Sequence, residues 1–158
     1  FGELKIMSPG GGQHGRIAMK IGRLLGNYVA EHQLGEVFAA ETGFLLAIDP
    51  DTVRAPDAAF VAADRFRGLE ETRGYLPTAP DLVIEVVSPN DSSSHVEEKA
   101  NSWIHFGVRL VLVVDPANRS IRAYRDQAAI SVYFAGDPVD VADIVDGWIF
   151  AVDDIFGS

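Results

Sequence analysis

A carboxylate lies in the middle of the most apolar segment of the chain, and its position suggests chemistry. Glu85 is preceded by Leu-Val-Ile and followed by Val-Val within residues 81–88, which reads as a central sheet strand. An ionised carboxylate among such side chains is costly unless a cation or an ion-pair partner stabilises it. Strand alternation places Asp81 on the same face, so Asp81 is an auxiliary candidate for the same site.

Two further acids occupy similar positions in the preceding predicted strands. Period-two alternation predicts strands over residues 37–48 and 53–62, and each strand has one acid on an otherwise small or apolar face, Glu41 and Asp57. If these strands lie next to the strand of Glu85, the three carboxylates converge as oxygen ligands suited to Mg²⁺ or Mn²⁺. A strand-end acid that pairs with Arg or caps a turn is the alternative for Glu41 and for Asp57.

Two helices and several strands must position these acids. Apolar residues recur at three- and four-residue steps from Gln13 to Gln33, and an N-cap signature at residues 92–94 begins a second helix that ends near Gly107. The expected strands cover residues 37–48, 53–62, 81–88, 109–114 and 120–125, with a solvated loop or irregular helix over residues 64–77. This order predicts a mixed α/β fold with a central sheet flanked by helices.

Length and composition predict a single folded domain over residues 1–158. A hydrophobic fraction of 47% with 23% charged residues is ordinary for a globular chain and excludes a disordered one. We expect the core to span about residues 13–125 and the acidic tail, residues 126–158, to form short strands. The opening segment, Phe1–Met7, resembles a strand, and because the chain starts with Phe a preceding N-terminal piece is expected.

Other features limit the classes of function. No apolar run approaches the roughly 20 residues of a membrane helix, so we expect no membrane partner. The chain has no cysteine, which excludes disulfides, thiolate zinc sites and cysteine nucleophiles and is compatible with the expected cytoplasmic location.

The net charge bears on whether the protein contacts nucleic acid. A formal charge of −10 is unfavourable for phosphate binding, but the tail holds seven acids and no Lys or Arg, so residues 1–125 carry only −3. His14, at the start of the first helix, is an auxiliary candidate near the acids, with a capping or surface role as the alternative. Candidate phosphate-contacting residues, each of which has a solvated surface charge as its alternative, are Arg16, Lys20, Arg23, Arg65, Arg67 and Arg73.

Several motifs together resemble those of a known protein family. They are Val53-Arg-Ala-Pro-Asp57, Ala79-Pro-Asp-Leu-Val-Ile-Glu85-Val-Val-Ser-Pro89, Lys99 in the next helix, Gly107-Val-Arg109 and Val113-Val-Asp115-Pro116. The chain resembles the putative restriction endonuclease family of bacteria, a branch of the PD-(D/E)XK nuclease superfamily, from about Gly2 through Arg125. The resemblance implies a restriction-endonuclease-like fold, with a core of one helix, three strands, a second helix and further strands.

The resemblance also implies roles for particular residues. Asp57 and Glu85 match the metal-binding acids of the motif, whereas Val87 stands where the superfamily usually has lysine. The family supplies this lysine from the following helix, and Lys99 is the candidate. Lys99 lies at the border of the apolar stripe of its helix, which favours an inward amine. The alternatives are a stem that packs while the amine reaches solvent, or an ion pair with a neighbouring glutamate.

The function expected from the resemblance is hydrolysis of DNA phosphodiester bonds by a metal-dependent endonuclease. Asp57, Glu85 and Glu41 would bind Mg²⁺ or Mn²⁺, and Lys99 would orient water or stabilise the developing charge. A homodimer is expected because cleavage of both strands of a duplex favours two-fold symmetry. The alternative is a catalytically inactive nuclease-fold domain acting as an oligomerising or binding module, which the acidic charge and Val87 favour.

Overall fold

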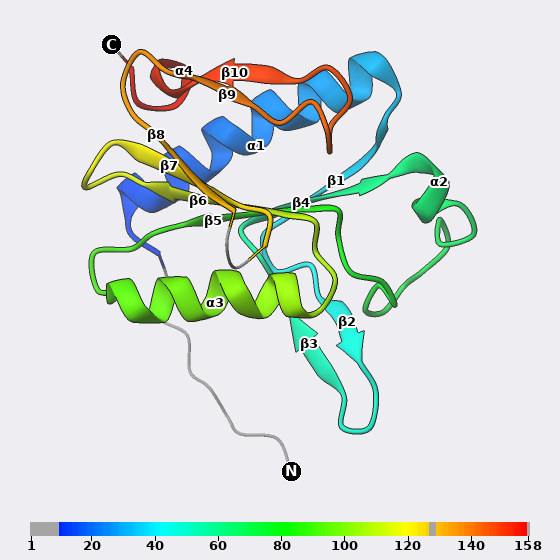
Figure 1. Cartoon of the computed structure of the whole chain (residues 1–158). Coiled ribbons are helices and arrows are strands. Elements are labelled where there is room, and N and C mark those ends of the chain that lie inside the picture. Colours follow the sequence, from blue (N-terminus) through cyan, green and yellow to red (C-terminus); the bar gives the residue numbers. More distant parts are fainter. Residues whose placement is uncertain (1–9, 127–128, 158) are drawn as a thin grey trace.

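A six-stranded mixed sheet forms the centre of the computed structural model, which describes residues 10–126 and 129–157 (Figure 1). In spatial order the strands are β1 (Gly35–Ala39), β4 (Ala58–Ala62), β5 (Leu82–Val86), β6 (Leu110–Asp115), β7 (Ser120–Tyr124) and β8 (Ile130–Tyr133). β5 and β6 pair in parallel, and all other neighbours in this sheet are antiparallel. The predicted mixed α/β class is confirmed, whereas the strand expected over Phe1–Met7 lies outside the described residues.

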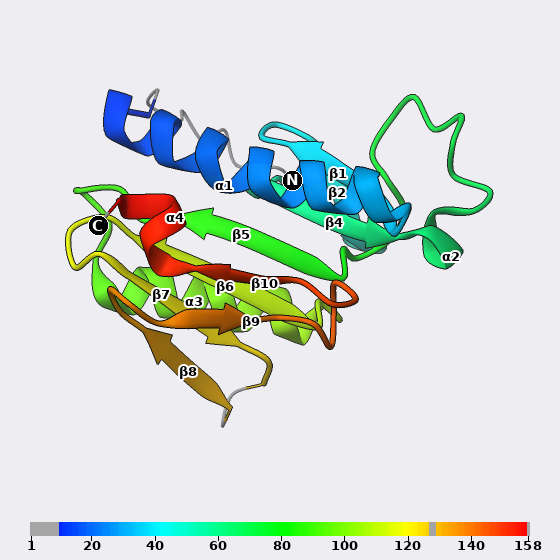
Figure 2. The same ribbon diagram turned by 90° about the horizontal axis from the view of Figure 1, so that it is seen from above.

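One face of the sheet is covered by the first helix and the C-terminal elements (Figures 1 and 2). α1 (Gly12–His32) packs its apolar stripe, represented by Ile21 and Leu25, against Leu82 and Ile84 of the sheet. The hairpin of β9 (Pro138–Asp140) and β10 (Ile149–Ala151) and the short helix α4 (Val152–Phe156) lie beside α1 on this face. Because α1 is amphipathic, its other face remains in solvent.

The opposite face of the sheet is covered by α3 (Ser93–His105) and the hairpin of β2 (Phe44–Ala47) and β3 (Thr52–Arg54). Ser92 caps α3 as predicted, since its Oγ accepts a hydrogen bond from the His95 N–H at 3.2 Å. α3 packs Ala100 and Trp103 against Val83 and the neighbouring strands. Glu85 leaves β5 on this same face, two residues beyond Val83.

The prediction of two long strands, over residues 37–48 and 53–62, is wrong in one respect: each of them is divided into two shorter strands. β1 ends at Ala39, and the turn that follows holds Glu41 in the left-handed region at φ 73° before β2 begins. Pro56 interrupts the second strand between β3 and β4, since it has no N–H to donate to a sheet ladder. The ends of both strands bend away from the main sheet and form the β2–β3 hairpin.

The acidic tail forms strands, as predicted, and also the short helix α4, which was not predicted. Its apolar residues are buried in the same cluster as α1, so the core extends beyond residue 125. They are Val139, Val141, Val145, Trp148, Phe150, Val152 and Ile155. Within the described residues, no helix has the length and apolar character needed to cross a membrane.

Candidate metal and catalytic site

Asp57 and Glu85 come together through the pairing of β4 with β5. Asp57 immediately precedes β4, and Ala58 pairs with Ile84, so the two acids lie on neighbouring strands. The Asp57 Oδ2 accepts a hydrogen bond from the Val86 N–H at 2.7 Å. This bond, made to the residue after Glu85, fixes the Asp57 carboxylate beside the end of β5.

Glu85 is buried, with 8% of its surface exposed. Its Oε2 forms an ion pair with the Nζ of Lys99 at 2.5 Å. Its Oε1 is buried and has no hydrogen-bond partner among the residues that the structure describes. A buried carboxylate oxygen without a partner is costly, so Glu85 still has the capacity to bind a donor or a cation.

Lys99 reaches Glu85 from α3, on the face that the sequence favoured. It lies between Val96 and Ala100, which are both buried against the sheet, while 40% of its own side chain remains exposed. Helix α3 begins seven residues after β5 ends, so the ammonium group comes from a neighbouring layer rather than from the strand itself. Val87, two residues beyond Glu85, packs with the apolar side chains under α3.

The protonation of this pair reflects burial and three nearby charges. Burial, the largest cause, raises the pKa of Glu85 above its usual range; Lys99 acts in the opposite direction, and the charge of Asp57 raises it further. Burial alone lowers the pKa of Lys99, but Glu85, Asp57 and Asp91 together outweigh it, so the pKa of Lys99 is raised and its amine stays protonated. One ammonium group therefore compensates several carboxylates incompletely.

Glu85→Gln is expected to become more stable relative to the wild type as pH rises, in metal-free buffer. Because the pKa of Glu85 is higher in the folded than in the unfolded protein, its contribution is fully present below the unfolded pKa and is lost as pH rises through the folded pKa. Gln resembles the protonated acid and does not titrate. Urea unfolding with EDTA between about pH 4 and about pH 8 measures the difference; a mutant that loses relative stability with rising pH would contradict it.

His14 joins this site from the opposite layer of the molecule. It lies in the first turn of α1, and its Nε2 is 3.3 Å from the Asp57 Oδ2. The same Asp57 oxygen thus faces both the imidazole and the Val86 N–H. The auxiliary candidate His14 therefore contacts a predicted metal ligand directly.

A small cavity opens beside Glu85 and Lys99. Two residues that the sequence did not single out, Asp91 and His95, also line it. Asp91 lies in the turn between β5 and α3, where its Oδ2 accepts a hydrogen bond from the Ser88 N–H at 2.8 Å. Molecules of the size of water can therefore reach the Glu85–Lys99 pair through this cavity.

Glu41 lies apart from these contacts. It is exposed in the turn after β1, and no ion pair or hydrogen bond of its side chain occurs among the described residues. Across residues 10–126 and 129–157, no group of three or more His, Asp or Glu side chains is gathered as a ready-made metal site. The structure brings Asp57 and Glu85 together and places Glu41 in a separate turn. The role predicted for Glu41 as a third metal ligand stays a prediction.

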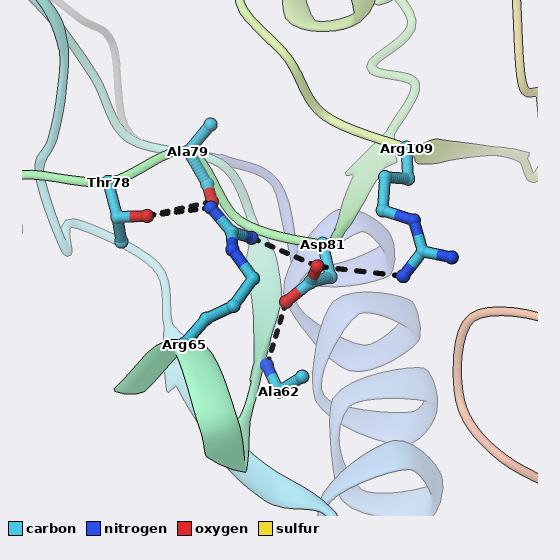
Figure 3. Close-up of polar contacts among 6 residues, drawn as sticks. All are labelled: Ala62, Arg65, Thr78, Ala79, Asp81 and Arg109. Atoms are coloured by element: carbon cyan, nitrogen blue, oxygen red, sulfur yellow. Dashed lines mark hydrogen bonds and ion pairs between the residues drawn. The ribbon is translucent and has the colours of Figure 1, made fainter. Parts of the chain in front are cut away.

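Asp81 lies at the other end of β5 from Glu85 and has a different set of partners (Figure 3). It is 1% exposed, and its Oδ2 accepts a hydrogen bond from the Ala62 N–H at 2.7 Å. Its Oδ1 forms ion pairs with Arg65 at 2.9 Å and Arg109 at 3.8 Å, with angles outside hydrogen-bond geometry. Arg65 also donates to the Thr78 Oγ1 at 2.8 Å. These contacts tie α2 (Ala63–Phe66) and the following loop to the sheet.

Asp81→Ala is expected to lower the free energy of unfolding by about 2–4 kcal/mol, because the N–H of Ala62 and an ion-pair network lose their buried acceptor. Arg109→Met is the milder comparison, expected to cost less than about 1 kcal/mol, since Arg109 is half exposed and more distant. Chemical denaturation checks both. Equal effects for the two variants would show that Asp81 is not the centre of this network.

The six basic candidates are distributed unequally around the site. On α1, Arg23 lines a groove between α1 and β1 that leads to His14 and Asp57, whereas Arg16 and Lys20 do not line it. Arg65 is held by Asp81 at the far end of β5. The remaining two candidates, Arg67 and Arg73, are exposed in the loop after α2.

A second groove approaches Lys99 from the side of the β2–β3 hairpin. Arg54 at the end of β3 and Trp103 of α3 line this groove, and sequence reasoning identified neither. The basic residue within the Val53–Asp57 motif was the one sequence feature that could have pointed to this groove. The groove itself joins segments that are far apart along the chain, so local sequence patterns do not predict it.

The sheet order and the two helical layers define a mixed α/β protein in which a pair of acids lies next to Lys99. The chain belongs to the Uma2 family, described as "Putative restriction endonuclease", whose model matches residues 1–153, so the family inferred from the sequence motifs is confirmed. The fold is similar to the crystal structure of a putative nuclease belonging to DUF820 from Anabaena variabilis ATCC 29413. That likeness has a TM-score of 0.80 at 22% sequence identity and covers 96% of this chain and 84% of that chain. A comparison with curated proteins finds no significant match.

Proposed function

We propose that the protein is a metal-dependent endonuclease that hydrolyses DNA phosphodiester bonds, with Asp57 and Glu85 as the ligands of Mg²⁺ or Mn²⁺. The observation that carries this proposal is the buried Oε1 of Glu85, which has no hydrogen-bond partner among the described residues. Glu85 lies on the strand that pairs with the strand following Asp57. Carboxylate oxygens are the donors that these cations prefer. Membership of the family described as "Putative restriction endonuclease" supports nuclease chemistry for this chain.

The charges of the site favour a cation. Asp57 and Glu85 face one ammonium group, and the charge of Asp57 already raises the pKa of Glu85. A divalent cation would relieve this repulsion and satisfy the free Oε1. When bound, such an ion supplies Lewis acidity toward a phosphate oxygen and makes a water molecule more acidic.

The residues of this chain would do the positioning. Lys99 is protonated and partly exposed, so its amine can donate hydrogen bonds to the attacking water or to phosphate oxygens that gain charge. The Val86 N–H and His14 hold the carboxylate of Asp57 in one orientation. A preorganised site of this kind requires little rearrangement during the reaction.

DNA as the substrate and a dimer as the active form belong to the same proposal. Two basic residues line grooves that include residues of the site: Arg23 shares a groove with Asp57, and Arg54 shares a groove with Lys99. Two copies related by two-fold symmetry could present two such sites to the two strands of a duplex. A bacterial enzyme acting on DNA would work in the cytoplasm.

The alternative function is an inactive nuclease-fold module that oligomerises or binds a partner. A net charge of −10 and valine at position 87 favour it. Thermal stability distinguishes the two, because a ligand that binds only the folded state raises the melting temperature. An active site should be stabilised by Mn²⁺, whereas a site that has lost its ligand function should not respond.

The direct experiment is incubation of supercoiled plasmid with purified protein and Mn²⁺ or Mg²⁺. We expect nicked and then linear DNA, with both products abolished by EDTA. Protein that leaves the plasmid intact and gains no thermal stability from Mn²⁺ would contradict the proposal and favour the inactive module.

A further inference from the structure

The groove between the β2–β3 hairpin and α3 combines positive charge with buried donors. Arg54 lies on the hairpin side, and His95, Glu98, Lys99 and Trp103 lie on the α3 side. Lys99 also lines the cavity of the candidate catalytic site, so the groove and that site are continuous. A molecule bound at Glu85 could therefore extend into this hairpin–α3 groove.

Two residues that line this groove carry buried hydrogen-bond donors for which the described residues supply no acceptor. Trp103 is fully buried, and its indole Nε1 has no partner among the described residues. The Arg54 Nε is likewise buried without a partner in the part of the chain that the structure describes. Buried donors are nearly always satisfied in folded proteins, so two unsatisfied donors on residues that line one groove indicate an acceptor from outside the chain.

The charges of the groove favour an anionic acceptor. The guanidinium of Arg54 lies 5.8 Å from the ring centroid of Phe106, which holds it against the end of α3. Glu98 is the acid that lines this groove, but its side chain is exposed to solvent, where its charge is screened. Arg54 in contrast is partly buried, and its charge acts in a less polar environment.

We propose that the hairpin–α3 groove binds a phosphate group of the nucleic-acid backbone, next to the phosphodiester held at Glu85. A phosphodiester has several acceptor oxygens and no donors, which matches the Arg54 Nε and the Trp103 Nε1, since neither has an acceptor among the described residues. The assignment of this phosphate to DNA rests on the proposed nuclease function. The binding site itself requires no metal and no catalysis.

The two tryptophans of the chain provide a test with an internal control. Trp103 lines the groove, whereas Trp148 packs with α1 on the opposite face of the sheet. The two indole N–H signals of ¹⁵N-labelled protein would be followed by NMR in EDTA, with inorganic phosphate or a short single-stranded oligonucleotide as the probe. Trp148→Phe assigns the signals. We expect the Trp103 signal to move with the oligonucleotide and the Trp148 signal to remain in place.

Two arginine variants test whether the charge in the groove contributes to binding. Arg54→Met should weaken oligonucleotide binding roughly tenfold, in the range of one lost hydrogen bond from a charged donor. Arg109→Met removes the same charge at the Asp81 end of β5 and should leave the affinity unchanged. A Trp103 signal that does not move with either probe, or equal losses in both variants, would overturn the proposal.

The two probes distinguish the source of the phosphate. Movement with the oligonucleotide at much lower concentration than with inorganic phosphate supports a backbone subsite. Movement with inorganic phosphate alone would overturn the assignment to nucleic acid. The binding test is carried out in EDTA, which prevents metal-dependent cleavage, so its outcome is independent of the plasmid assay. If the groove does not bind phosphate, plasmid cleavage can still be observed. If the plasmid stays intact, phosphate binding in the groove can still be measured.

Discussion

Lys99→Met is expected to reduce the Mn²⁺-dependent cleavage rate by at least about a hundredfold, as for loss of a single donor to a charged transition state. Met keeps the apolar stem that packs beside Val96 and Ala100 but removes the ammonium group from Glu85. Plasmid cleavage under saturating Mn²⁺ measures the rate. Isothermal titration with Mn²⁺ should still detect binding, because both carboxylates remain.

The matched comparison is the double variant Val87→Lys, Lys99→Met. Val87 lies two residues beyond Glu85, so a lysine there leaves the same side of the strand and can reach the same volume. The double variant should recover part of the lost rate; full recovery is not expected, because a misplacement of about 1 Å can cost roughly a hundredfold. Wild-type cleavage by Lys99→Met would mean that Lys99 serves only to neutralise Glu85.

Asp57→Asn is expected to lower cleavage by about a thousandfold and to weaken Mn²⁺ binding, because one of two anionic ligands becomes neutral. The amide oxygen of Asn can still accept the hydrogen bond from the Val86 N–H, so the local backbone should be preserved. The folded protein should not lose stability without metal, since the repulsion between Asp57 and Glu85 disappears. Plasmid cleavage and metal-free denaturation test the two halves of this expectation.

Asp64→Asn is a suitable control for Asp57→Asn. Asp64 is exposed in α2, beyond the far end of β4, and its replacement changes the net charge by the same amount. We expect wild-type cleavage and Mn²⁺ affinity from this variant. A similar loss in Asp57→Asn and Asp64→Asn would indicate a general effect of charge on DNA binding rather than a metal ligand.

The sequence predicted the parts of the fold that depend on local pattern. The stripe of α1, the N-cap of α3 and the apolar strands β5 and β6 each follow from spacing within a few residues. Glu85 could also be identified locally, because a carboxylate inside a buried strand needs a partner. Its partner Lys99 required the resemblance to the family, since the α3–β5 contact joins two layers of the structure.

Other parts of the site depend on contacts that spacing does not encode. The convergence of Glu41 with Asp57 assumed uninterrupted strands, but the turn at Glu41 and the break at Pro56 direct those strand ends into a separate hairpin. Asp81 shares a strand face with Glu85, yet Arg65 and the Ala62 N–H engage it at the far end of β5. Strand alternation predicts which face of the sheet a side chain is on, whereas its contact partners depend on the tertiary fold.

The groove residues illustrate the same limit. Arg54 and Trp103 lie 49 positions apart in the sequence. Arg54 belongs to the β2–β3 hairpin, which is separate from the main sheet, and Trp103 belongs to α3. Nothing in the local pattern around Trp103 distinguishes it from an ordinary core residue. Its Nε1, which has no hydrogen-bond partner within the described part of the chain, distinguishes it from the other core side chains, and this is a property of the folded structure.

Binding of a divalent cation by Asp57 and Glu85 together is the step on which the proposed activity depends. The most direct measurement is a crystal structure of the protein soaked in Mn²⁺, with anomalous diffraction recorded to locate the ion. We expect an anomalous peak between the carboxylates of Asp57 and Glu85, with the Oε1 of Glu85 among the ligands of the ion. A crystal saturated with Mn²⁺ that shows no peak there, and in which Glu85 still contacts only Lys99, would contradict it.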